Sequence, residues 1–295
     1  MVQMSLGEIP IKVAQEETFE KEILVDNEIG GFSKYMVDEN GVATLIEFDF
    51  TGAFDEITSI GNYGLHSAFY NCSGITGSIN FPNLTSIGDY GLQQTFNNCS
   101  GITGLINFPN LTSIDTYALE RAFYYCTGIT SVSFPSLTSI GNYGLQQAFC
   151  GCSGITGSIN FPNLTSIGDY GLKNTFLNCT GITSVSFPNL TSVGTYGLQV
   201  AFSGCSGITS VSFPNLTSVG DNGLVQIFYY CTGITGSINF PSLTSVGTRG
   251  LDRAFYRCTG ITELHFRADT QSVIEAQTGY GGKFGATNAT IYFDL

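Results

Sequence analysis

Apolar residues recur along the chain in a unit of 26 or 27 residues. In the copy CTGITSVSFPSLTSIGNYGLQQAFCG, which spans residues 126–151, Ile129, Val132 and Phe134 follow the spacing LxxLxL and are separated mainly by Thr and Ser. A short β-strand with one buried side has this spacing. We therefore predict one parallel strand per repeat, with its hydroxyl side chains facing solvent.

A second extended segment follows in each unit. Pro135 lacks a backbone donor and ends the first strand, after which Leu137 and Ile140 repeat the apolar spacing. The chain is therefore expected to turn a corner at the proline.

The last segment of the unit has the spacing of a short helix. Leu145, Ala148 and Phe149 lie at i, i+3 and i+4, which is one buried helical face. Residues of N-cap type precede this segment in the eight repeats: Asn62, Asp89, Thr116, Asn142, Asp169, Thr195, Asp221 and Thr248. A glycine such as Gly154 follows 12 residues on, in a C-capping role. We predict about two helical turns.

Strands on one side and helices on the other predict curvature. Strands stack about 4.8 Å apart, whereas packed helices need about 10 Å. The predicted fold is therefore an α/β repeat solenoid shaped as a horseshoe, with parallel strands on the inner face and short helices on the outer face.

Eight cysteines are each followed by Ser or Thr and then by Gly-Ile-Thr. They are Cys72, Cys99, Cys126, Cys152, Cys179, Cys205, Cys231 and Cys258. Since they share one repeat position, we interpret them as a ladder of reduced, buried thiols, with Cys150 as one extra. Metal binding, or redox pairing of Cys150 with Cys152, is the alternative, but no His or acidic cluster accompanies them.

Two glycine columns have different predicted reasons. The longer repeats add a glycine before the strand, as at Gly77, Gly104, Gly157 and Gly236, which predicts a β-bulge. The column that contains Gly144 has Ala118 as its one exception. Because alanine resists a positive φ, that position is expected to need a small side chain rather than a left-handed backbone.

Three regions follow from the repeat boundaries. Residues 57–262 hold eight repeats, and residues 1–56 are predicted to form an acidic N-terminal cap with a leading strand and a helical run near residues 15–23. Residues 263–295 are predicted to form a C-terminal cap, with a helix over 270–277, a glycine-rich loop and a last strand over 290–294.

The charge of −13 lies mostly outside the repeats, because residues 1–56 hold 13 acidic and 3 basic side chains. A repeat array without a basic stripe argues against nucleic acid and anionic membrane surfaces as partners. No stretch approaches the roughly 20 apolar residues of a membrane span. The first residues lack the pattern of a signal peptide.

The alternation of ITSVSFP, LTSIG, an AF pair and a cysteine resembles the BspA-like leucine-rich repeats, although about three extra residues precede the Phe. The resemblance implies a leucine-rich-repeat fold and a noncatalytic bacterial or protist protein at the cell surface or outside the cell. Such a protein would bind host proteins or other cells. The C-terminal tail also resembles the endings of repeat proteins of gut Firmicutes and their prophages. A structural part of a phage tail or surface assembly, and thus of a virion, is therefore the alternative.

Candidate ligand-binding residues lie where the repeats differ most. These are the two positions after the Leu and the two positions after the Phe of the predicted helical segment. The candidates are Tyr70, Tyr124, Tyr125, Tyr229, Tyr230, Arg253, Tyr256 and Arg257. Tyr and Arg anchor interfaces because they bury a large area at modest entropy cost. A solvent-facing edge that is free to vary is the plainer interpretation. The expected partner is a protein or a glycan, and the chain is expected to be a monomer.

The predicted inner face offers a second candidate site. Its outward Ser and Thr are joined in the longer repeats by Asn80, Asn107, Asn160 and Asn239. A flat, repetitive polar surface suits an extended ligand such as a glycan, although a merely solvated strand has the same composition.

Catalysis is not expected. His66 and His265 are the two histidines, and neither has a Ser or Cys and an Asp in a recognisable arrangement. His265 is interpreted as an ordinary edge residue. The run GYGGKFG precedes a strand and lacks the GK[ST] ending of a phosphate-binding loop. We expect no metal and no cofactor.

Overall fold

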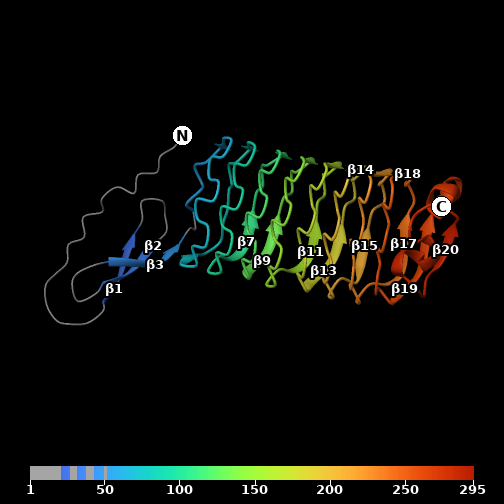
Figure 1. The fold of residues 1–295 in the computed structure, drawn as a ribbon. Coiled ribbons are helices and arrows are strands. Elements are labelled where there is room, and N and C mark those ends of the chain that lie inside the picture. Colours follow the sequence, from blue (N-terminus) through green and yellow to red (C-terminus); the bar gives the residue numbers. More distant parts are fainter. Residues whose placement is uncertain (1–20, 27–31, 38–42, 50–51) are drawn as a thin grey trace.

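The computed structural model describes residues 21–26, 32–37, 43–49 and 52–295 (Figure 1). Three strands lie before the repeats: β1 (Lys21–Asp26), β2 (Phe32–Val37) and β3 (Ala43–Asp49), each antiparallel to the next. The helical run predicted near residues 15–23 lies partly outside the described residues, and its last three residues belong to β1. Strand β3 pairs in parallel with β5 (Ile75–Thr76), so it is a leading rung of the stack.

The first predicted strand of each repeat forms, and these strands stack in parallel along one side. They are β5, β7 (Thr103–Asn107), β9 (Gly128–Ser133), β11 (Thr156–Asn160), β13 (Gly181–Ser186), β15 (Ser210–Ser212), β17 (Thr235–Phe240) and β19 (Gly260–Phe266). The register shifts at Gly104, Gly157 and Gly236, where φ is 76° to 78°. The predicted glycine bulges are therefore confirmed at these positions.

The second extended segment also forms, as a column of two-residue strands. They are β4 (Ser59–Ile60), β6 (Ser86–Ile87), β8 (Ser113–Ile114), β10 (Ser139–Ile140), β12 (Ser166–Ile167), β14 (Ser192–Val193), β16 (Ser218–Val219) and β18 (Ser245–Val246). Serines pair with the equivalent serine of the next coil from β4 to β6 and from β8 through β18, as Ser139 does with Ser166. The apolar residue beside it is mostly buried.

The third side of each coil does not contain the predicted helix. Ala148 N–H bonds the Leu145 carbonyl three residues back at 3.0 Å, but Leu145 N–H bonds Gly171 of the next coil at 2.8 Å. Alternate amides thus bond within the coil and between coils. Every fourth residue has a positive φ, as at Tyr143 (58°) and Gln147 (55°). Successive turns of this kind bury residues three and four apart just as a helix does, which explains the wrong prediction.

The residues predicted to cap helices instead join neighbouring coils. Asn142 Oδ1 accepts a hydrogen bond from Asp169 N–H at 2.9 Å, and Asp169 Oδ1 accepts one from Thr195 N–H at 2.7 Å. At Gly154, an added Cβ would lie 2.4 Å from the carbonyl oxygen of Thr127. That glycine is needed because the backbone of the preceding coil approaches closely, and it caps no helix.

Hydrogen bonds join the coils on all three sides. The spacing between coils on the side without strands is therefore not wider than on the strand sides. The predicted horseshoe curvature is therefore wrong, and Figure 1 shows a nearly straight stack. The repeat solenoid itself is confirmed. Among the described residues, helices occur only after the coils, at η1 (Ala268–Thr270), α1 (Gln271–Glu275) and η2 (Tyr280–Gly285).

Rows of identical side chains fill the interior. Phe149 stacks between Phe123 and Phe176 with ring centroids 5.4 and 5.6 Å apart, and all three rings are fully buried. A second row of stacked phenylalanines follows the long strands, as between Phe161 and Phe187. A buried column of Leu and Ile accompanies each row. Stacking of coils therefore supplies a core that one coil lacks.

The cysteines form a third interior row. All nine are unpaired, and of the repeat position only Cys72, in the first coil, is exposed. Seven thiols each donate to the carbonyl oxygen of the phenylalanine 29 or 30 residues earlier, at 2.9 to 3.3 Å. The predicted ladder of buried, reduced thiols is therefore confirmed from Cys99 to Cys258.

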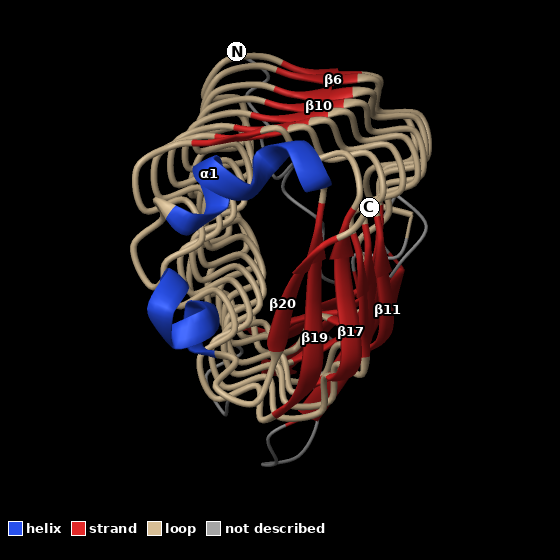
Figure 2. Ribbon diagram, turned by 90° about the vertical axis from the view of Figure 1, so that its right-hand side faces the viewer, coloured by secondary structure: helices blue, strands red, loops and turns tan. Residues whose placement is uncertain are grey.

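The last residues close the C-terminal end of the stack. Strand β20 (Thr290–Phe293) pairs in parallel with β19, and α1 and the 3-10 helices lie across the open coil (Figure 2). Ile274 and Phe284 are buried there. The helix and strand predicted in this region form, with the helix shorter than expected.

Candidate binding surfaces

The predicted Tyr and Arg residues lie on the turn side in two separate clusters. Tyr124 and Tyr125 have ring centroids 4.6 Å apart. Four coils further on, the Tyr229 ring lies 4.7 Å from Tyr230 and 4.8 Å from Tyr256. Arg253 and Arg257 of the second cluster are exposed, and Tyr70 lies exposed in the first coil. The structure therefore does not bring all eight residues together.

The local backbone directs these side chains outward. Tyr125, Tyr230 and Arg257 precede the cysteine of their coils and have φ values of 55°, 61° and 67°. Between the clusters the same columns hold small or apolar residues, namely Cys150, Gly151, Leu177, Asn178, Ser203 and Gly204. Those three coils interrupt the aromatic surface.

The second cluster combines aromatic rings with positive charge. The guanidinium carbon of Arg257 lies 5.5 Å from the Tyr256 ring centroid, and a hydrogen bond to Tyr256 raises the pKa of Arg257. Burial between neighbouring rings is the main cause that raises the pKa of Tyr229. A surface of this composition suits an aromatic or acidic patch on a protein.

The predicted asparagine column is discontinuous. Asn107 Nδ2 donates to Asn80 Oδ1 at 3.1 Å. Asn160, however, pairs with Ser186 of the next coil, and Asn239 with His265. The four asparagines therefore form one adjacent pair and two isolated residues on the long-strand side. This side is not the concave inner face of a horseshoe that was predicted.

A polar groove of about 630 Å³ runs across five coils near the two-residue strands, and the sequence reasoning missed it. It is lined by Ser136, Thr138, Asn163, Thr165, Asn189, Thr191, Asn215, Thr217 and Ser242, here called the hydroxyl groove. Thr165 Oγ1 donates to the Thr138 carbonyl at 3.0 Å, and Asn163 Nδ2 to the Pro135 carbonyl at 2.7 Å. Since these donors are used between coils, the uncharged groove presents mainly acceptors. The recurring PNLTS run was its signal.

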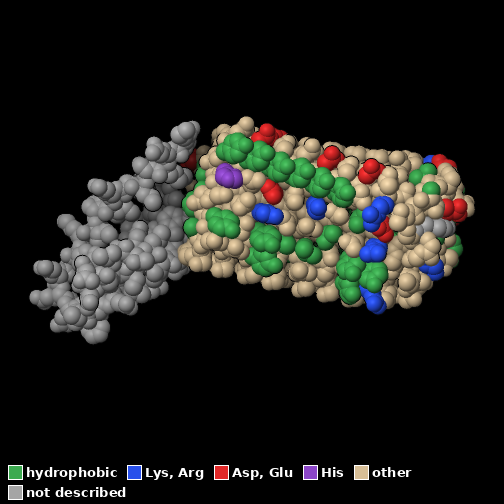
Figure 3. Space-filling model, in the orientation of Figure 1, with side chains coloured by type: hydrophobic (Ala, Val, Ile, Leu, Met, Phe, Trp, Pro, Cys, Tyr) green, Lys and Arg blue, Asp and Glu red, His purple; other side chains and the backbone are tan. Residues whose placement is uncertain are grey.

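A partly exposed aromatic row on the turn side was also missed. It consists of Tyr63, Tyr90, Tyr117, Tyr143, Tyr170 and Tyr196, here called the tyrosine row. Successive rings are nearly parallel, with centroids 4.4 to 4.8 Å apart, and Figure 3 shows a continuous band along this face. All six residues have a positive φ of 56° to 59°. Tyrosine at one position of six successive repeats was the signal.

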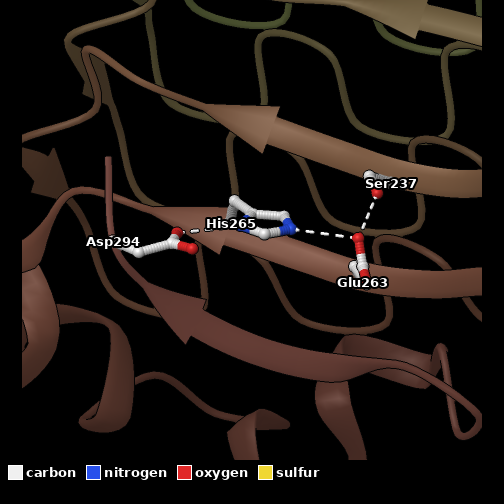
Figure 4. Close-up of polar contacts among 4 residues, drawn as sticks. All are labelled: Ser237, Glu263, His265 and Asp294. Carbon is white, nitrogen blue, oxygen red and sulfur yellow. Dashed lines mark hydrogen bonds and ion pairs between the residues drawn. The ribbon is translucent and has the colours of Figure 1, made fainter.

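His265 is more constrained than the predicted edge residue (Figure 4). Its Nδ1 lies 2.8 Å from Asp294 Oδ1 and its Nε2 3.2 Å from Glu263 Oε2. The hydrogen bond to Asp294 is the main cause that raises the pKa of His265. Ser237 Oγ donates to Glu263 rather than to the imidazole. These four residues therefore tie β17, β19 and the chain end together and contain no Ser–His nucleophile pair.

Two further observations concern the described part of the chain. It holds no group of three or more His, Cys, Asp or Glu side chains arranged to bind a metal ion. None of its helices is both long and apolar enough to cross a membrane.

The comparison with protein families agrees with the repeat geometry. The sequence profile described as the BspA type leucine-rich repeat region, six copies, matches residues 44–174, 120–248 and 172–277. Together these matches extend over residues 44–277 of the 295. No curated protein matches the chain significantly. The chain belongs to the BspA-type leucine-rich repeat family.

Proposed function

We propose that the chain is a noncatalytic interaction or adhesion module that binds a protein or a glycan through the side of its solenoid. The observation that carries the proposal is the family membership, because BspA-type repeats suggest a protein-interaction or adhesion role. The same membership supports a location at the cell surface or outside the cell, and a host-derived ligand. We propose that the chain acts as a monomer.

Two surfaces support two kinds of ligand. The cluster of Tyr229, Tyr230, Tyr256 and Arg257 has the composition of a protein-binding hot spot. The hydroxyl groove is straight and uncharged, and its exposed acceptors suit the hydroxyl groups of a neutral glycan. A structural role in a phage tail or surface assembly stays a prediction from the sequence.

Binding of the full chain to a glycan array and to a panel of purified extracellular-matrix proteins tests the proposal. A protein ligand should bind at least tenfold more weakly to Tyr230→Asn, since hot-spot side chains carry most of the binding energy. Asparagine already occupies that column at Asn71, Asn98 and Asn178, so the fold should tolerate it. The matched variant Tyr125→Asn, in the other cluster, should bind normally.

A glycan ligand should instead be lost on Thr165→Arg, which fills the hydroxyl groove, and should be unaffected by Tyr230→Asn. Saturable binding in neither panel would contradict the proposed function.

A further inference from the structure

The tyrosine row is a long surface of partly exposed aromatic side chains. Its five successive centroid separations of 4.4 to 4.8 Å give a row about 23 Å long. Tyr63 at one end is 59% exposed, and the other five are half-buried. An extended peptide rises about 3.3 Å per residue, so about seven residues would cover the row.

A lysine side chain of one coil already contacts two rings of this row. Lys173 Nζ lies 5.1 Å from the Tyr170 ring centroid and 5.5 Å from that of Tyr196. Burial lowers the pKa of Lys173. No described carboxylate lies within ion-pair distance of it. The rings therefore accept a partly desolvated ammonium group, as expected of a cation–π site.

No other coil of the row has a lysine or arginine at the position of Lys173. Beside Tyr63 this position holds His66, whose ring centroid lies 6.0 Å from that of the tyrosine. Beside the other four rings it holds Gln93, Glu120, Gln146 and Gln199, so the chain itself supplies no positive charge at this position there.

Carboxylates border the row at fixed positions. Asp89 and Asp169 each accept a backbone N–H of the next coil, at 3.1 and 2.7 Å, which holds the side chain beside the rings without neutralising its charge. The pKa of Tyr117 is raised mainly by burial, and the nearby charge of Glu120 contributes. Figure 3 shows acidic side chains alongside the band of rings.

The two arginines nearest to the row in sequence already have acidic neighbours. Arg121 Nε lies 3.8 Å from Glu120 Oε1, and Nη2 of Arg249, which continues the tyrosine column, lies 2.6 Å from Asp252 Oδ2. Asp89 and Asp169 have no described basic side chain within ion-pair distance, so their negative charge exceeds the single positive charge of Lys173 beside the rings.

We propose that the tyrosine row and its flanking carboxylates bind an extended, Lys- or Arg-rich segment of a partner protein. The inference rests on the proposed function and names the chemistry of a protein ligand. Rings attract the cationic heads, carboxylates complement their charge, and the straight row matches an extended chain.

A labelled decalysine peptide tests this by fluorescence anisotropy with the full chain at low salt, with decaglutamate as the control peptide. Decalysine should bind, and the double variant Tyr143→Asn with Tyr170→Asn should weaken binding about five- to thirtyfold. Asparagine is native to this column at Asn222, where φ is 55°, so the fold should tolerate both changes.

A second variant moves affinity in the opposite direction. Lys173→Gln removes the ammonium group that occupies the rings of Tyr170 and Tyr196. This variant should bind decalysine about two- to fivefold more tightly than the wild type. Glutamine is native to this column at Gln146 and Gln199. Arg253→Gln removes the same charge away from the row and should change affinity less.

Equal binding of decalysine by the wild type and the double tyrosine variant would overturn the inference and assign binding to the acidic N-terminal residues. An equal gain for Lys173→Gln and Arg253→Gln would also overturn it. If a matrix protein or glycan binds the double tyrosine variant as it binds the wild type, the proposed function stands but the tyrosine row is not its binding site.

Discussion

Cys152 Sγ lies 3.0 Å from the carbonyl oxygen of Phe123, a residue of the preceding coil. The thiol donates to an acceptor that its own coil does not supply. Six other cysteines repeat this bond, so each thiol satisfies a buried backbone carbonyl of its neighbour. Burial without such a bond costs about 1–3 kcal/mol for a polar group.

Thiol reactivity should reflect this burial. Burial raises the pKa of Cys99 to about 12 and that of Cys150 to about 11, so neither forms the reactive thiolate at pH 8. Cys72 is exposed. Titration of the native chain with a thiol reagent, followed by mass spectrometry, should label Cys72 rapidly and the other eight only after denaturation. Rapid labelling of a second cysteine would contradict the buried row.

Close approach of coils should make Gly154 intolerant of a side chain. An added Cβ would lie 2.4 Å from the Thr127 carbonyl oxygen and 2.7 Å from that of Ile129. Gly154→Ala should therefore lower the free energy of unfolding by more than about 2 kcal/mol, measured by urea denaturation. Gly281→Ala is the control, because nothing lies within 4 Å of its Cβ position. A loss at Gly281 as large as that at Gly154 would rule out the steric explanation.

Val200 is the least suitable residue at its backbone position. Its φ is 58°, which β-branched residues strongly disfavour, whereas Asn174 has φ 55° at the same place one coil earlier. Val200→Asn should stabilise the chain by about 1 kcal/mol, and Asn174→Val should destabilise it by a similar amount. Thermal melting of both variants measures this. Opposite signs to those expected would show that these positions are not left-handed.

The contacts of His265 predict a pH dependence. Hydrogen bonds to Asp294 and Glu263 raise its pKa above the ordinary 6.5, so the folded state holds the proton more tightly than the unfolded state. This stabilisation is complete below about pH 6.5 and is lost as the pH rises through the folded-state value. The advantage of the wild type over His265→Gln in unfolding midpoint should therefore be larger at about pH 6 than at about pH 9.

Glu263 sets the acidic limit of this effect. Hydrogen bonds from Ser237 and His265 lower the pKa of Glu263 below the ordinary 4.5. The stabilisation that the ionised carboxylate gives the folded state is therefore present above about pH 4.5 and is lost as the pH falls through the folded-state pKa. An advantage over His265→Gln that stays constant from pH 6 to pH 9 would show that the imidazole charge does not hold β19 to the chain end.

Much of the fold follows from composition repeated at fixed offsets. The strand at Ile129, the bulge at Gly157 and the thiol row were predictable, because each depends on a side-chain type at one repeat position. The helix was not. Leu145, Ala148 and Phe149 face inward both in a helix and in successive turns, and apolar spacing alone does not separate the two backbones.

A second signal distinguishes these backbones. Positions with positive φ lie four residues apart, and several hold Asn or Gly, as at Asn98, Gly151 and Asn178. Those types favour left-handed conformations and are poor in a helix interior. The tyrosines at the first of these positions concealed the pattern, because tyrosine has no such preference.

The candidate surfaces were only partly predictable. Choosing positions that vary between repeats identified Tyr230 and Arg257, but this choice passed over the tyrosine row, whose residue type is constant across six coils. Side chains at equivalent positions, such as Tyr124 and Tyr229, contact each other only if their coils are adjacent. Contact between them therefore depends on how the coils stack and not on any one repeat.

The central claim is that the turn side of each coil is hydrogen-bonded to its neighbour. Scalar couplings across hydrogen bonds, measured by NMR on the deuterated full chain, test it most directly. The structure predicts a coupling between the amide nitrogen of Leu145 and the carbonyl carbon of Gly171. A coupling from the amide nitrogen of Phe149 to the carbonyl carbon of Leu145, as in an α-helix, would contradict it.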